Sequence, residues 1–164
     1  MIKNILYVGN SIPNYLQNDN FNVILYNMDL TESANEILDK LIDFLNYKLF
    51  DIVVAENLYA FYTMQITGHL KLLINPYIPK NIEELNDTIK ESYSDYLNNY
   101  YDSENSYGNF GLFVEGNETI NNFKKLFYVE HCYVYSEITS EIINNIIESI
   151  KVTCKNDGEL VFII

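Results

Sequence analysis

Short apolar runs alternate along the chain with longer segments in which apolar and polar residues recur at helical spacing. Six apolar runs end at turn-forming residues and predict strands, at 2–8, 21–26, 51–55, 70–74, 110–115 and 126–135. Five amphipathic segments predict helices, at 32–47, 57–67, 81–100, 117–125 and 138–150. Thr31 is expected to cap the first helix and Gly68 to end the second.

This order of elements predicts a three-layer α/β/α sandwich with a mostly parallel sheet, formed by one domain over residues 1–164. The run 51–55 is wholly apolar after its first residue, which is typical of a strand covered on both faces. Ligands of such folds bind at the carboxyl ends of the strands, so candidate site residues are sought there.

Two segments of the chain each have two alternative interpretations. Residues 81–107 form either a lid over the site or an ordinary covering helix with a loop. Residues 151–164 form an additional hairpin, turning at 156–158, or an edge strand. Because an exposed apolar edge pairs readily with another chain, this segment is also a hypothetical homodimer contact.

Charge and cysteine content exclude several classes of function. The 164 residues include ten Lys, no Arg and 23 acidic residues, for a net charge of −13. A chain without a basic face is not expected to bind nucleic acid or an anionic membrane. No window of 18 apolar residues predicts a membrane-spanning helix, and the apolar start lacks a signal-peptide cleavage site.

The two cysteines indicate the cellular compartment, and their spacing does not predict a metal site. Cys132 and Cys154 lack metal-ligand spacing, so we expect free thiols in a cytoplasmic protein, a disulfide being the alternative. The sequence also lacks a glycine-rich phosphate loop. We therefore expect neither a metal nor a cofactor.

Several motifs together resemble the YqiA-like esterase family of small bacterial α/β-hydrolases. DIVVAENLYAFYT at 51–63 resembles its nucleophile elbow, VVGSSLGGFYA, and LLINPYIP at 72–79 resembles its LiNPavrP. The opening ILYVGNS resembles ILYlHGFnSS, and VEGNETI at 114–120 resembles the acid-bearing tGDEvl. The resemblance spans about residues 3–150 and implies an α/β-hydrolase fold.

The same resemblance implies a degenerate catalytic triad. Asn57 occupies the position of the nucleophilic Ser, and Asn117 that of the Asp. His131, in Glu130-His131-Cys132-Tyr133, is either the remnant of the catalytic His or a strand residue. An amide is not a nucleophile of the serine type, and it cannot stabilise an imidazolium by charge. His69 is expected to be structural.

Other residues at the strand ends are candidates for binding. The loop after the first strand and the elbow would supply oxyanion-hole groups, through Asn10 and Leu58. The full set of candidate ligand-binding residues is Gly9, Asn10, Ser11, Glu56, Leu58, Tyr59, Asn75, Pro76, Tyr77 and Glu118. Neutral amides and tyrosines suit a small, uncharged, polar-aromatic ligand. The tyrosines that would line or cover the site are Tyr59, Tyr77, Tyr93, Tyr96, Tyr100 and Tyr101.

Three functions follow from these residues. The first is a catalytically degraded esterase relative that binds a small ligand or a protein partner. The second is a weak or atypical ester hydrolase in which Glu56, His131 or Glu118 activates water. The third is a structural partner in a larger complex. A nucleophilic Cys132–His131 pair is disfavoured because adjacent strand residues point to opposite faces.

Overall fold

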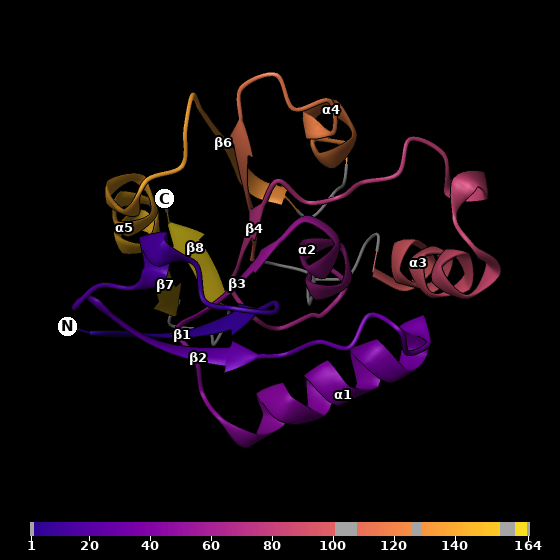
Figure 1. The fold of residues 1–164 in the computed structure, drawn as a ribbon, viewed down its shortest axis with the longest axis horizontal. Helices are drawn as coiled ribbons and strands as arrows, with labels where there is room; N and C mark the ends of the chain where they lie inside the picture. Colours follow the sequence, from indigo (N-terminus) through magenta and orange to yellow (C-terminus); the bar gives the residue numbers. More distant parts are fainter. Residues whose placement is uncertain (1, 101–107, 126–128, 155–159, 164) are drawn as a thin grey trace.

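The computed structural model describes residues 2–100, 108–125, 129–154 and 160–163 (Figure 1). Six strands form an all-parallel sheet in the order β2-β1-β3-β4-β5-β6. They are β1 (Lys3–Val8), β2 (Phe21–Tyr26), β3 (Ile52–Glu56), β4 (Lys71–Ile74), β5 (Asn109–Val114) and β6 (Val129–Tyr135). The helices are η1 (Asn14–Leu16), α1 (Ala34–Tyr47), α2 (Asn57–Thr63), η2 (Ile82–Glu84), α3 (Asp87–Tyr100), α4 (Ile120–Phe123) and α5 (Ser140–Ser149). The predicted fold class is confirmed.

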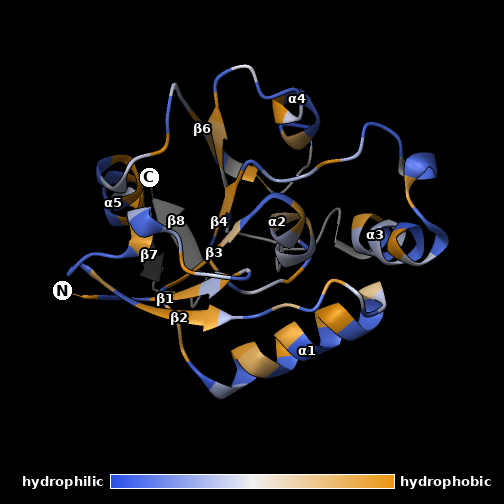
Figure 2. Ribbon diagram, in the orientation of Figure 1, coloured by the Kyte–Doolittle hydropathy of each residue, from blue (hydrophilic) through white to orange (hydrophobic). Residues whose placement is uncertain are grey.

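Both faces of the sheet are buried, which explains the apolar character of the strands. Leu6, Val53 and Leu73 point to one face, which α1, α2, α3 and α4 cover. Their neighbours along the strands point to the other face, where α5 and η1 supply Ile143, Ile146, Ile147 and Leu16. Figure 2 shows the hydrophobic residues concentrated on the strands and the polar ones on the outer loops.

The two helix ends predicted from a capping residue differ from the prediction. The cap of α1 is Ser33 and not Thr31, because Ser33 and Glu36 form a reciprocal capping box. The Thr31 hydroxyl instead donates to Asp29 at 2.6 Å. Helix α2 ends at Thr63, five residues before Gly68, and the residues between them connect α2 to β4.

The predicted helix over 81–100 is divided in two. Glu83 and Glu84 lie in the separate turn η2, and α3 begins only at Asp87. The Asn86 side chain caps this second start by accepting from the Ile89 N–H at 3.0 Å. Because Asn86 favours a new helix start over continuation of the first, the long periodic segment breaks there.

Helix α3 packs as a covering helix. Tyr93 and Tyr96 are buried, and the Tyr93 ring lies 5.1 Å from that of Phe61 on α2. This packing matches the covering-helix interpretation of 81–100, whereas residues 101–107 and the side chain of Tyr100 lie outside the described part. None of the described helices is long and apolar enough to cross a membrane.

The tail forms a hairpin of its own. Strand β7 (Lys151–Cys154) pairs antiparallel with β8 (Leu160–Ile163) in a two-stranded sheet, so the predicted hairpin is present and neither strand extends the main sheet. The predicted turn at 156–158 lies outside the described residues. The homodimer through this segment stays a prediction.

Lys71, the first residue of β4, is buried and joins that strand to α2. Its Nζ donates to the carbonyl of Ile66 and, at 3.4 Å, to that of Met64, so the side chain caps the end of α2. No carboxylate pairs with it among the described residues. Burial lowers the pKa of Lys71 from 10.5 to about 7. The sequence alone did not single out this residue.

The stability of the fold should therefore rise with pH between about 7 and 9.5. In this window the unfolded chain holds a proton on Lys71 that the folded chain has begun to lose, so raising the pH favours folding. The slope has an upper limit of about 1.4 kcal/mol per pH unit. The measurement is urea denaturation of wild type and Lys71→Met, and the variant should lose this slope.

The matched control is Lys80→Met, because the Lys80 side chain is 69% exposed. It should keep the wild-type pH profile. The scan stops at about pH 9.5 because the buried tyrosines, with raised pKa values, begin to oppose folding above it. An identical slope in Lys71→Met and wild type would contradict the assignment of the effect to Lys71.

Candidate functional site

The turn between β3 and α2 holds Asn57 in a left-handed conformation. Asn57 has φ of +50°, and it follows β3 directly and begins α2, with no loop between. Most L-residues lose about 1–2 kcal/mol in this region, whereas Asn tolerates it better. Asn57 is exposed at the carboxyl edge of the sheet. The sequence analysis identified this position, and the structure places it at a strained strand-to-helix turn.

A second asparagine, Asn75, organises the neighbouring strand ends. It ends β4 with φ of +41°, and its Oδ1 accepts from the Val114 N–H at 3.0 Å and from Asn117 Nδ2 at 3.2 Å. The Val114 donor identifies this atom as oxygen, because an amide NH2 cannot accept. Asn117 Oδ1 in turn accepts from the N–H and the hydroxyl of Thr119.

The segment 75–79 connects the elbow to the loop after β5. The Tyr77 N–H donates to the carbonyl of Asn57 at 3.0 Å, and the Pro76 carbonyl accepts from the Thr119 hydroxyl at 3.1 Å. The structure thus brings together three predicted positions, Asn57, Asn75 and Asn117. The side-chain hydrogen bonds of Asn117 within the described residues are all internal to this network, so its side chain holds the loops.

His131 does not join this group. It lies within β6 in register with Phe110, near the start of β5, and its ring contacts that of Tyr133 at 4.4 Å. Asn117 follows the opposite, carboxyl end of β5. The structure therefore places His131 as a strand residue, the alternative to the triad remnant. His69 precedes β4 at the amino edge of the sheet.

Cys132 is a free thiol on the opposite face of β6 from His131. It packs against the cluster under α1–α4, whereas Tyr133 packs against the α5 side. Burial raises the pKa of the Cys132 thiol, which makes it a poorer nucleophile at neutral pH. The structure thus separates the two side chains, as the alternation along a strand predicts. The side chain of Cys154 lies outside the described part.

Glu56 is the half-buried carboxyl at the elbow. Burial raises its pKa, and no side-chain hydrogen bond holds it among the described residues. Burial together with the charge of Glu56 raises the pKa of the Tyr7 hydroxyl on β1. A carboxyl with a raised pKa at a strand end is the kind of group that acts as a general base.

A cavity of about 370 Å³ opens at the ends of β1 and β2. Two predicted residues line it, Asn10 after β1 and Tyr59 in α2. The remaining lining residues form the segment after β2 and were not predicted: Asn27, Met28, Asp29 and Leu30. The sequence feature that could have indicated this segment is the pair Asp29 and Thr31, which forms a hydrogen-bonded turn.

The other candidate residues lie around the carboxyl edge without lining this cavity. Ser11 is exposed, and Leu58 packs against the α1–α4 side of the core. Glu118 is exposed and pairs with Lys80 at 3.5 Å. Tyr77 is exposed, whereas Tyr93 and Tyr96 belong to the core. Gly9 follows β1 with the Tyr7 ring packed against it, and Pro76 is buried.

No cluster of metal-ligating side chains occurs in the described ranges. Comparisons of the chain with models of protein families, with curated proteins and with solved structures gave no match. The likeness to YqiA-like esterases therefore rests on the sequence motifs alone.

Asn117→Asp should destabilise the protein by about 1–3 kcal/mol at pH 7. The change replaces an N–H donor by a carboxylate oxygen facing Asn75 Oδ1, which the Val114 N–H holds in place. The measurement is urea denaturation at pH 7 and at about pH 3.5, near the carboxyl pKa. The deficit should shrink at low pH, where a protonated carboxyl can donate.

The control for the added charge is Asn121→Asp, an exposed residue of α4. This variant should stay near wild-type stability at both pH values. Equal stability of Asn117→Asp and wild type at pH 7 would argue against the network as described.

The stabilities of variants at position 57 should rank as expected for a residue with positive φ, with the Gly variant more stable than the Ala variant. Asn57→Gly should be within about 0.5 kcal/mol of wild type, and Asn57→Ala should lose about 1 kcal/mol. The control pair at Asn145, exposed within α5, should show the opposite order, because Ala is the better helix former. The same order at both positions in urea denaturation would contradict the strained turn.

Proposed function

We propose that the protein is a catalytically degraded, esterase-like α/β-hydrolase homologue that acts by binding. The observation that carries this proposal is Asn57 at the turn between β3 and α2, with φ of +50°. A nucleophile elbow is a strained strand-to-helix turn of this kind, with its nucleophile exposed. Here the same geometry presents an amide, which does not attack an ester carbonyl.

The surroundings of Asn57 support a loss of serine-type chemistry. The chain has two histidines, and His69 and His131 both lie away from the elbow. Serine hydrolysis requires a base within hydrogen-bond reach of the nucleophile. Asn117, at the position of the acid in the resemblance, is held by Asn75 and Thr119. A turn without an imidazole base beside Asn57 is suited to binding and not to serine-type acyl transfer.

The position of the cavity supports small-molecule binding. Strand β1 lies between β2 and β3, so the chain crosses to opposite sides of β1 in successive connections. Ligands of open parallel sheets bind in the crevice at such a switch point, outside the carboxyl ends. The switch point lies between β1 and β3, and the cavity borders it through Asn10 after β1 and Tyr59 in α2 after β3. Its volume of about 370 Å³ is within the range of small-ligand sites. A reducing compartment such as the cytoplasm would keep the Cys132 thiol free.

One observation favours a second function, weak ester hydrolysis through Glu56. Its carboxyl is half-buried at the elbow with a raised pKa and without a hydrogen-bond partner among the described residues. Such a group can activate a water directly, without a protein nucleophile. The two functions differ in whether an ester is turned over.

The test is hydrolysis of p-nitrophenyl acetate and butyrate by wild type, Asn57→Ser and Glu56→Gln. We expect wild type to match the buffer blank, and Asn57→Ser to gain nothing, because no imidazole lies beside residue 57. Ser11→Ala serves as the control for the serine that follows the lining residue Asn10. The rates should be measured at about pH 6–9 to cover a raised carboxyl pKa.

Each contrary result has a distinct meaning. Turnover by wild type that is lost in Glu56→Gln would support the hydrolase and overturn the binding-only proposal. A gain in Asn57→Ser would show that a base reaches the elbow in solution. Turnover unaffected by Glu56→Gln but lost in Ser11→Ala would move the nucleophile to the loop after β1.

A further inference from the structure

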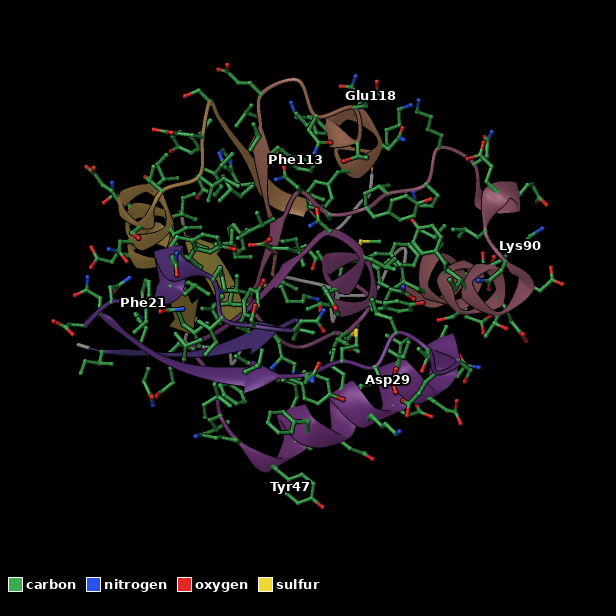
Figure 3. The ribbon with its side chains drawn as sticks, viewed as in Figure 1. Phe21, Asp29, Tyr47, Lys90, Phe113 and Glu118 are labelled. Atoms are coloured by element: carbon green, nitrogen blue, oxygen red, sulfur yellow. The ribbon has the colours of Figure 1, made fainter. Side chains whose placement is uncertain are left out.

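The cavity beside β1 and β2 has a lining that determines which ligand charge it accepts. Its residues come from three connections, after β1 (Asn10), after β2 (Asn27 to Leu30) and at the start of α2 (Tyr59). Met28 is buried, and it anchors the middle segment to the core under α1–α4. Figure 3 shows Asp29 beside the start of α1, whereas Tyr47 lies at the other end of that helix.

Three side chains offer oxygen acceptors to this cavity. The amides of Asn10 and Asn27 have no hydrogen-bond partner among the described residues. Asp29 is oriented by Thr31, whose N–H and hydroxyl both donate to Oδ1, at 2.9 and 2.6 Å. Oδ2 of Asp29 has no such partner in the described ranges. Two amide oxygens and one carboxylate oxygen are therefore uncommitted.

The charge of the lining is negative. Asp29 is the one ionisable acid or base among the lining residues, apart from the Tyr59 phenol. The hydrogen bonds from Thr31 lower the pKa of Asp29, so its carboxylate is ionised at neutral pH. The positive charge of Lys40 on α1 also lowers the pKa of Asp29, but Lys40 Nζ is ion-paired with Glu32. The chain as a whole carries −13, so a small anion is repelled from this opening.

We propose that this cavity binds the ammonium group of a small organic amine, an inference that rests on the binding function proposed above. An ammonium has three donors and no acceptor, which matches three acceptor oxygens. Tyr59, Met28 and Leu30 offer apolar surface to the rest of the ligand. This ligand differs from the uncharged one expected from Asn57 and Asn117, because neither of those residues lines the cavity and Asp29 does.

The test uses three probes of similar shape and different charge, benzylammonium, benzyl alcohol and benzoate. Each is titrated into the 15N-labelled protein at pH 7, and the side-chain amide signals of Asn10 and Asn27 are followed. Benzylammonium should bind with Kd of about 1 mM, a common affinity for a ligand of this size. Benzyl alcohol should bind about fivefold more weakly, and benzoate should give no saturable shift.

The matched variants are Asp29→Asn and Asp43→Asn. Asp29→Asn keeps the oxygen that accepts from Thr31, but it removes the charge and replaces the uncommitted Oδ2 by an NH2 donor, so benzylammonium should bind at least about fivefold more weakly. Asp43→Asn removes the same charge from an exposed position on α1, away from the cavity, and should bind like wild type. Raising NaCl from about 0.05 to 0.5 M should weaken only binding that depends on Asp29.

Three results would overturn the inference. One is benzyl alcohol or benzoate binding as tightly as benzylammonium, the former supporting an uncharged ligand. Another is benzylammonium binding equally to Asp29→Asn and wild type. The third is no shift of Asn10 or Asn27 with any probe up to about 20 mM, a limit that includes weak fragment binding. Ester turnover through Glu56 would overturn the binding-only function while leaving this charge selectivity measurable, so the two failures are distinguishable.

Discussion

A parallel sheet must be covered on both faces, and the rest of this structure follows from that requirement. The central strands alternate between two apolar clusters, so most side chains of β1, β3, β4 and β5 are committed to packing. In these strands the polar side chains lie near the ends. At the amino edge, the buried Lys71 amino group serves to hold the end of α2. The carboxyl edge is then the place where side chains remain available for binding.

The carboxyl edge is built around asparagines. Asn57 and Asn75 adopt positive φ at successive strand ends, and Asn75 and Asn117 link the loops by side-chain hydrogen bonds. An amide suits this position because it donates and accepts at once, which a carboxylate cannot do. It also tolerates the left-handed region better than most residues. Asn57 and Asn75 thus allow the tight turns at these strand ends, and Asn75 and Asn117 hold the loops together.

The cavity is beside this network and not within it. The network of Asn75, Asn117 and Thr119 connects the ends of β4 and β5, whereas the cavity lies at the ends of β1 and β2. Its opening is shaped by the segment between β2 and α1, which a capping box and the Asp29–Thr31 turn hold in one conformation. A site fixed by local hydrogen bonds before a ligand arrives loses less entropy on binding.

The sequence by itself determined the order of the elements and the parallel sheet, because periodicity and apolar runs depend on local residues and on burial alone. Helix ends were less predictable: Ser33 and Thr31 are both good caps, and the choice depended on Glu36 reaching back. Tertiary structure decided which strand ends meet. It placed His131 inside β6, away from Asn57, and Asp29 beside Asn10, because strand order and register bring distant residues together and neither is encoded in local spacing.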